Sequence, residues 1–89
     1  MNEASIPDQM QPIAQRRLYA VMLSVRLLEL RRERNMSQEQ VAQQAGIATF
    51  SYRKLEHGES NPGTVANPRL STLLALSNVF DITIHELLP

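Results

Sequence analysis

The chain has no cysteine among its 89 residues, and only 4% of them are aromatic. Without cysteine it forms no disulfide bond, no thiolate metal site and no cysteine nucleophile. The few aromatic residues and the near absence of alternating Val, Ile and Thr argue against β-strands. No apolar run approaches the roughly 18 residues that a membrane span needs. The first residues include acids but no basic segment, which is unlike a secretory signal, and we expect a cytoplasmic protein.

Sequence patterns for catalysis are missing as well. The chain has no Ser/His/Asp arrangement, no glycine-rich phosphate loop and no metal-ligand spacing. Its two histidines, His57 and His85, stand apart from other candidate ligands, and we expect both at the surface. No two carboxylates are paired for acid–base work. These absences predict a protein that is not an enzyme and that uses no metal and no cofactor.

The composition favours packed helices. Hydrophobic residues make up 43% of the chain, and Leu, Ala, Gln, Glu and Arg dominate, as expected for one small helical domain. A polar arm with two prolines precedes the helices, and a turn-rich stretch lies between the third and the fourth. We therefore predict a flexible arm over 1–12 and an all-α, five-helix domain over 13–89. The helices are expected at about 13–34, 37–45, 49–57, 69–79 and 83–88.

Residues 37–58 carry the most informative pattern. Ser37 is a suitable N-cap, and Gln40, three residues on, completes a capping box. Gly46 interrupts the apolar spacing, and glycine adopts the left-handed turn there without a Cβ penalty. A second short helix starts near Thr49 and ends at Gly58. Two short helices joined by a tight turn form a helix-turn-helix unit, whose second helix enters the DNA major groove.

The charge distribution qualifies this interpretation. The net charge is formally zero, whereas nucleic-acid-binding domains are usually basic. Residues 31–57 carry five basic side chains against three glutamates, a net charge of +2, whereas residues 58–89 carry one against three, a net charge of −2. The positive excess therefore lies on the helix-turn-helix unit. We expect few phosphate contacts and weak non-specific binding.

The order of these segments resembles the phage-repressor and Cro-like helix-turn-helix family, the XRE type. The resemblance covers about residues 23–88. It rests on Leu27-x-x-Leu30-Arg31, on MSQEQVA at 36–42, on Gly46-Ile47, on Leu55-Glu56-His57-Gly58, on Asn67-Pro68-x-Leu70-x-Thr72-Leu73 and on ITIHELL at 82–88. It implies a lambda-repressor-like, five-helix fold with an N-terminally extended first helix. It also implies a buried ion pair between Arg31 and Glu56, which a guanidinium fork and a carboxylate form with two hydrogen bonds.

The chain departs from the family pattern at several positions. Ala48 stands where a capping Ser or Thr is usual, so Thr49 is expected to serve as the N-cap instead. Asp81 replaces a usual glycine. Tyr52 occupies a usually aliphatic core position, and we expect its hydroxyl to reach the surface. About six extra residues, around 61–66, lengthen a loop that in the family lies near the DNA backbone, and this loop has no basic residue.

The resemblance also implies which side chains contact DNA. Base contacts fall on the first turn and outward side of the third helix, at Thr49, Phe50, Ser51, Arg53 and Lys54. Lys54 can donate to guanine, Arg53 to a base or a phosphate, and Phe50 can pack on a thymine methyl, unless it is a core residue. Gln38, and with it Ser37, falls at the phosphate-contacting start of the second helix, although a capping role suits Ser37.

The first helix carries a second apolar face. Leu23, Leu27 and Leu30 match the family core, and five more apolar residues cluster on nearly the opposite side. These are Leu18, Val21, Met22, Val25 and Leu28. Either a second copy of the helix covers them, which makes a homodimer, or the N-terminal arm folds back with Ile6, Met10 and Ile13. Leu87 and Leu88 keep a C-terminal dimer interface open.

The sequence thus predicts a small, sequence-specific transcription regulator that binds double-stranded DNA. We expect it to be a repressor. It is expected to bind a palindromic operator as a homodimer, without a membrane segment or a small-molecule ligand domain. The alternative is a protein-interaction module or antitoxin-like partner that uses the same fold with little DNA binding. The neutral charge, the acidic loop and the apolar first helix support that alternative.

Overall fold

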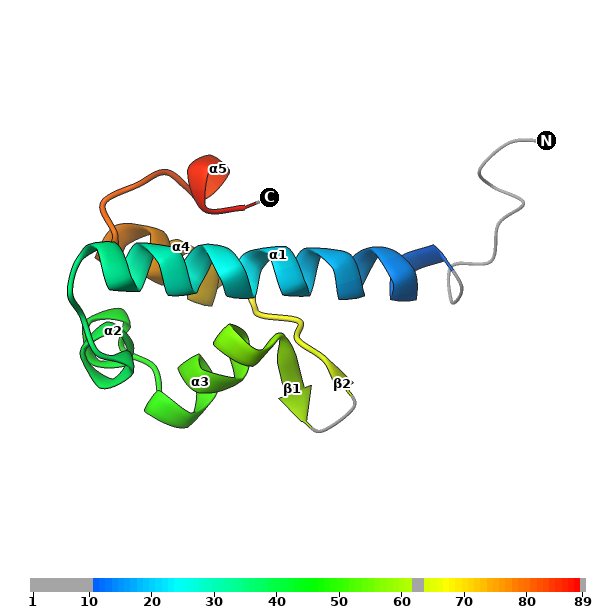
Figure 1. Cartoon of the computed structure of the whole chain (residues 1–89), viewed down its shortest axis with the longest axis horizontal. Helices are drawn as coiled ribbons and strands as arrows, with labels where there is room; N and C mark the ends of the chain where they lie inside the picture. Colours follow the sequence, from blue (N-terminus) through cyan, green and yellow to red (C-terminus); the bar gives the residue numbers. More distant parts are fainter. Residues whose placement is uncertain (1–10, 62–63, 89) are drawn as a thin grey trace.

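The described residues of the computed structural model form five helices and one short antiparallel strand pair (Figure 1). The structure describes the backbone over 11–61 and 64–88 and the side chains over 14–59 and 65–88. In chain order the elements are α1 (Gln11–Glu33), α2 (Gln38–Ala45), α3 (Thr49–His57), β1 (Glu59–Asn61), β2 (Thr64–Val65), α4 (Leu70–Val79) and α5 (Ile84–Leu87). The prediction of an all-α, five-helix domain is confirmed.

Local hydrogen bonds explain where α2 and α5 begin. The Ser37 hydroxyl accepts from the Gln40 backbone N–H, and the Gln40 side chain accepts from the Ser37 N–H. Thr83 and Glu86 repeat this capping box at α5. The expected capping role of Thr49 is wrong, because Ala48 is the N-cap of α3 and makes no side-chain hydrogen bond. An extended backbone at Ala48 is enough to start the helix one residue later.

The turns use residues in the left-handed conformation. Gly46 ends α2 with a φ of 71°, and Gly58 ends α3 with a φ of 75°. Asn35 and Asp81 adopt the same region after α1 and α4, with φ values of 54° and 55°. Asn and Asp tolerate this region better than other non-glycine residues, because their short polar side chains bond locally. Asp81 therefore fills the position at which the family usually has glycine.

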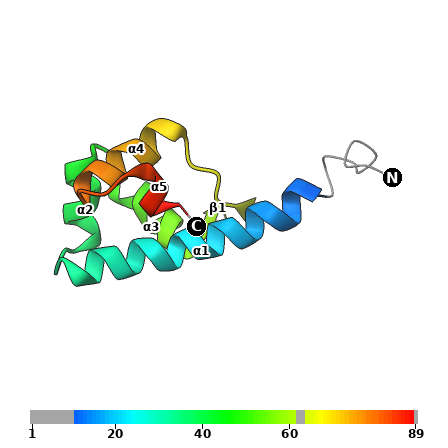
Figure 2. The ribbon, with the colours of Figure 1, turned by 90° about the horizontal axis from the view of Figure 1, so that it is seen from above.

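The long helix α1 is the base of the domain. It begins at Gln11, so the last two residues of the expected arm are helical, and the other arm residues lie outside the described part. Figure 2 shows α3, α4 and α5 on one side of α1, and in Figure 1 its N-terminal end extends past them. Arg26 in the second half of α1 and Arg34 just after it donate to the backbone oxygens of Glu86 and Phe80, at 3.3 and 2.7 Å, and tie α1 to the C-terminal part of the domain.

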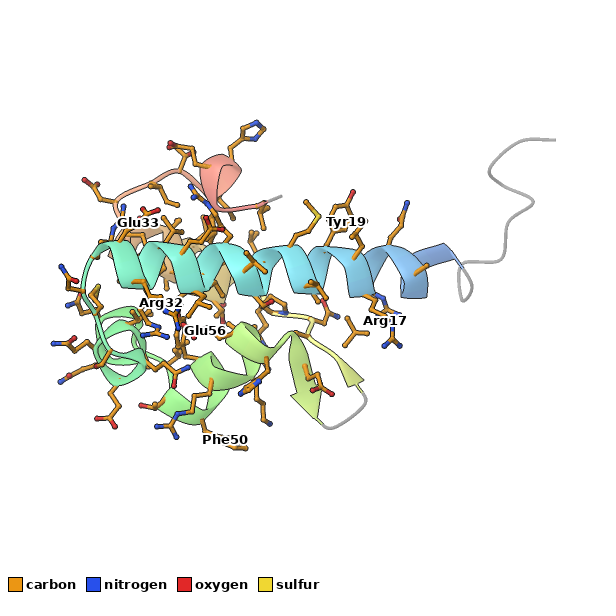
Figure 3. All side chains as sticks on the ribbon, in the orientation of Figure 1. Arg17, Tyr19, Arg32, Glu33, Phe50 and Glu56 are labelled. Atoms are coloured by element: carbon orange, nitrogen blue, oxygen red, sulfur yellow. The ribbon has the colours of Figure 1, made fainter. Side chains whose placement is uncertain are left out.

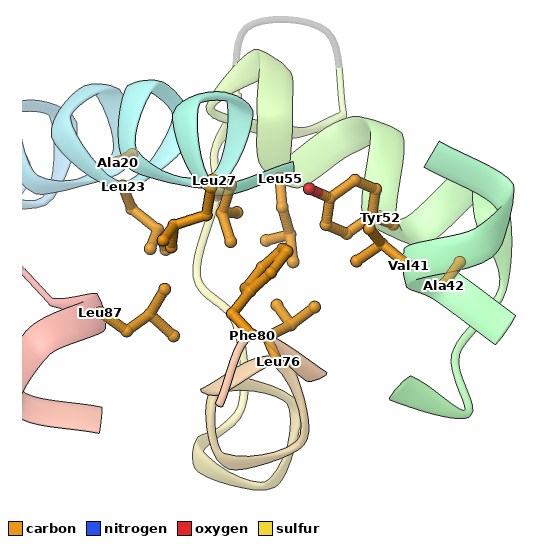
Figure 4. Packing of buried hydrophobic residues seen from close by; sticks show 12 residues of the cluster. Ala20, Leu23, Leu27, Val41, Ala42, Tyr52, Leu55, Leu76, Phe80 and Leu87 are labelled. Atoms are coloured by element: carbon orange, nitrogen blue, oxygen red, sulfur yellow. The ribbon is translucent and has the colours of Figure 1, made fainter. Parts of the chain in front are cut away.

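One hydrophobic core joins all five helices (Figure 4). Its largest fully buried side chains are Tyr52, Phe80, Leu27, Leu30, Leu76, Leu87 and Val41. The expectation that the Tyr52 hydroxyl reaches the surface is wrong, since this side chain is completely buried between α1 and α2. In α4, Leu76 is buried, but Leu70 and Leu74 are exposed. The apolar residues of α4 therefore lie on more than one face of that helix.

The strand pair was not expected from the composition. Glu59 pairs with Val65 and Asn61 with Thr64, and the Ala66 N–H donates to the Gly58 carbonyl at 3.0 Å. The pair forms part of the lengthened loop after α3. Strands of two or three residues are too short to need an alternating apolar pattern. Periodicity over a longer window therefore cannot detect them.

Candidate nucleic-acid interface

The outward face of α3 presents the predicted base-contacting residues. Phe50, Ser51 and Arg53 are exposed, whereas Thr49 and Lys54 are half-buried. Figure 3 shows Phe50 projecting from α3 away from α1. The helix is oriented in this way because Tyr52 and Leu55 fill its inner side. Phe50 is 65% exposed, which excludes a role in the core. Most of this large aromatic side chain is therefore exposed to solvent in the single chain.

A cation–π contact orders two of these side chains. The Lys54 ammonium nitrogen lies 4.4 Å from the centroid of the Phe50 ring. The two residues are four positions apart in α3, so they are neighbours on the helix surface. The face of an aromatic ring attracts a cation electrostatically. The outer surface of α3 thus presents the apolar ring of Phe50 with the positive charge of Lys54 beside it.

The inner end of α3 is anchored to α1 by Arg31 and Glu56. Arg31 Nε donates to Glu56 Oε2 at 2.6 Å, and Arg31 Nη2 donates to Oε1 at 3.0 Å. The Glu56 side chain is only 6% exposed. Arg31 also donates to the Met36 carbonyl at 3.1 Å, so one guanidinium holds the α1–α2 turn and α3 together. The geometry is the two-bonded arrangement that the family resemblance implied.

The pKa of Glu56 reflects this environment. Burial by itself raises the pKa of the carboxyl, but the hydrogen bonds from Arg31 and Gln38 outweigh burial and bring the pKa below its ordinary value. The pKa of Arg31 is raised, chiefly by its hydrogen bonds to Glu56. The pKa of Tyr52 is raised as well, mainly because its hydroxyl is buried. Glu56 is therefore ionised and Tyr52 neutral at pH 7.

Gln38 connects this ion pair to the surface of α3. Its amide nitrogen donates to Glu56 Oε1 at 2.9 Å, and its amide oxygen accepts from Arg53 Nε at 3.1 Å. The sequence placed Gln38 at the start of α2 as a phosphate contact and gave no sign of these bonds. The partners are 15 and 18 residues away, so no local spacing reveals them. Ser37, the other predicted phosphate contact, is engaged as the N-cap of α2.

The second apolar face of α1 is uncovered in the single chain. Leu18, Val21 and Val25 are more than half exposed, Met22 is 42% exposed and Leu28 is half-buried. Tyr19, which the sequence did not single out, is also exposed on the same N-terminal half. His57 and His85 are exposed, as expected. Among the described residues, no three His, Asp or Glu side chains gather as a metal site. None of the described helices has the length and apolarity to cross a membrane.

Comparison with known proteins assigns this architecture. A family model described as helix-turn-helix matches residues 27–87, the segment from the last third of α1 to the end of α5. The HTH-type transcriptional regulator DdrOP3 of Deinococcus deserti is 38% identical over 66 residues. That match covers 74% of the chain but 46% of the relative. The chain thus spans about half the length of this curated relative.

Proposed function

Because the chain belongs to the helix-turn-helix family, we propose that it is a sequence-specific, double-stranded DNA-binding transcription regulator. The relative that matches it is named as a transcriptional regulator, which supports the same function. Family membership also indicates a binding protein and not an enzyme, in agreement with the sequence. The regulator is proposed to act as a repressor, since an operator-bound protein blocks transcription without a further contact. It would work in the cytoplasm, beside the DNA.

The outer face of α3 is the observation that carries this proposal. Phe50, Arg53 and Lys54 lie on the side of α3 that does not carry the buried Tyr52 and Leu55, so this face of the helix can enter a major groove. Thr49 and Ser51 lie beside them and complete the proposed base-contacting set. Gln38 and the backbone N–H groups at the start of α2 face phosphates in this docking, because a helix N-terminus favours anions.

Dimerisation is proposed to occur through α1. Three exposed apolar residues and the half-buried Leu28 follow a spacing of three and four, the pattern of a coiled-coil seam: Leu18, Val21, Val25 and Leu28. Each precedes by two positions a residue of the core face: Ala20, Leu23, Leu27 and Leu30. Two positions on a helix correspond to about 200°. The helix therefore has two opposite apolar faces, and the domain covers one of them.

The direction of α3 is compatible with such a dimer. In the view of Figure 1, α1 runs horizontally, and Phe50, labelled in Figure 3, points downward. Figure 2, seen from above, shows α3, α4 and α5 on one side of α1, so the open side of α1 faces the viewer of Figure 1. A two-fold axis parallel to the Phe50 direction brings two α1 helices together antiparallel at their open sides. Rotation about that axis leaves the downward direction unchanged. The α3 helices of both copies then face one DNA duplex, as a palindromic operator requires.

Selection of bound sites from a random duplex library at about 150 mM salt tests the function, since salt screens non-specific phosphate attraction. We expect an inverted repeat with half-sites about one helical turn, roughly 34 Å, apart. Enrichment of a single half-site would retain sequence-specific binding and remove the stable dimer. Folded protein that enriches no site would contradict the proposal.

A protein-interaction module is the second candidate function. The uncovered apolar face of α1 favours it, because a helix surface of this kind commonly binds a partner helix. The salt dependence of DNA affinity separates the two functions. For a DNA-binding regulator, a plot of the logarithm of the DNA-binding constant against the logarithm of the salt concentration falls with a slope of about 0.9 for each phosphate that the protein neutralises. An interaction module shows little DNA affinity at any salt concentration.

A further inference from the structure

Gln38 occupies the centre of a hydrogen-bonded chain that runs from the core to the outer face of α3. Arg31 holds the buried Glu56 carboxylate with two bonds of 2.6 and 3.0 Å. Glu56 accepts from Gln38 at 2.9 Å, and Gln38 accepts from Arg53 Nε at 3.1 Å. Each of these hydrogen bonds joins side chains of two different helices. The exposed Arg53 guanidinium is thereby connected through Gln38 to the Arg31–Glu56 ion pair.

The bonding capacity of each group makes this arrangement directional. The Gln38 amide has two N–H donors and one oxygen acceptor, so donation to Glu56 orients the oxygen toward Arg53 and leaves one N–H for a phosphate. Arg53 has five N–H donors in a planar fork. Its Nε–H is used by Gln38. The Nη1 and Nη2 edge, which carries the other four N–H groups, therefore points away from Gln38.

We propose that Gln38 is a positioning residue that presents the Nη1 and Nη2 edge of Arg53 to a guanine. This inference rests on the proposed DNA-binding function and adds the base that one side chain selects. Two parallel donors of a guanidinium match the O6 and N7 acceptors of guanine in the major groove. Holding the fork before binding reduces the side-chain entropy that recognition costs. Without Gln38 the Arg53 side chain samples other rotamers, and its contact with guanine weakens relative to other bases.

The variant Gln38→Met tests the proposal, because methionine has a similar length and offers neither bond. Gln43→Met is the matched control, since Gln43 is an exposed glutamine on the same helix. Site selection with the wild-type protein identifies the guanine position as the one whose preference disappears in Arg53→Ala. We then expect Gln38→Met to lower the guanine-to-adenine affinity ratio at that position by about tenfold, within the range for one base contact. Gln43→Met leaves this ratio unchanged.

Two further measurements separate positioning from a general structural effect. In Arg53→Ala, the added change Gln38→Met should have no further effect on the base preference, because the residue that it positions is gone. In NMR spectra of the free protein, the Arg53 Nε–H, assigned by its absence in Arg53→Ala, should exchange slowly with water and should exchange rapidly in Gln38→Met. This second readout needs no DNA.

The possible outcomes are distinct. An unchanged guanine-to-adenine ratio in Gln38→Met overturns the proposal, even if affinity falls equally for all sequences, which would leave Gln38 as a phosphate contact only. Rapid exchange of the Arg53 Nε–H in the wild type also overturns it. Wild-type protein that is folded but selects no duplex overturns the proposed function itself. Sequence-specific binding without a guanine preference that depends on Arg53 overturns only this inference.

Discussion

Lys54 and Phe50 form a cation–π pair on the outer surface of α3, with the ammonium nitrogen 4.4 Å from the ring centroid. The pair lies at the surface, where such contacts contribute only about 0.5–1 kcal/mol. Phe50 is 65% exposed, so the domain gains little from burying the ring. An exposed aromatic residue with an ordered cation beside it is better explained by binding than by folding.

The variant Phe50→Ala should weaken operator binding while leaving the free energy of unfolding within about 0.5 kcal/mol of the wild type, as for other exposed positions. The expected loss of binding free energy is about 1–3 kcal/mol, the usual effect of one disrupted base pair in a site. Replacing the contacted thymine by uracil removes only its methyl group. The wild type should lose affinity on this replacement and Phe50→Ala should not. Equal losses for both proteins would exclude a methyl contact.

Breaking the Arg31–Glu56 pair should destabilise the fold strongly. In Glu56→Ala, Arg31 loses both bonds to a carboxylate that is 6% exposed, and removal of one member of such a pair costs about 3–5 kcal/mol. Urea unfolding measures the difference. Glu33→Ala is the control, because the Glu33–Arg34 pair spans 3.7 Å with Glu33 exposed, and surface pairs contribute below about 1 kcal/mol. If Glu56→Ala lowered the free energy of unfolding as little as Glu33→Ala does, the charges of Arg31 and Glu56 would not depend on each other.

The stability of the domain should fall in acid because of Glu56. Its pKa in the folded state is below the ordinary glutamate value of about 4.3, so the unfolded chain takes up the proton first as the pH falls. The stabilisation is complete above about pH 5, declines through the ordinary pKa, and is gone below the lowered folded-state pKa. Urea unfolding between pH 7 and pH 3 should show a shallower decline for Glu56→Gln. Parallel curves for the two proteins would contradict this assignment.

The double variant Val21→Glu/Val25→Glu should be monomeric and should bind the operator much more weakly. Both residues are exposed in the single chain, so the charges affect an interface and not the core. Sedimentation velocity measures the oligomeric state. Leu70→Glu/Leu74→Glu is the matched control, since these two leucines are also exposed apolar residues but lie on α4. If the α4 variant dissociates and the α1 variant stays dimeric, the interface involves the C-terminal half of the domain.

Much of the candidate site could be predicted because its residues lie on short, locally specified helices. The start of α3 near Thr49 followed from the turn at Gly46. The resemblance implied the outward positions of Phe50 and Arg53, with a core position for Phe50 left open as the alternative. The resemblance supplied the partner of Arg31. The hydrogen bonds of Gln38 were missed, because an amide at the surface has many possible partners and only the packing angle of α2 against α3 selects two of them.

The sequence by itself determined the five helices, the capping boxes of α2 and α5 and the turn at Gly46, since these depend on bonds between residues three to five positions apart. Ser37 with Gln40, Thr83 with Glu86, and Gly46 are of this kind. Only the tertiary structure decided that the Tyr52 hydroxyl is buried, that Leu70 and Leu74 remain exposed, and that a strand pair follows α3. These outcomes depend on how distant elements pack, and burial at one position depends on which side chains other helices bring to it.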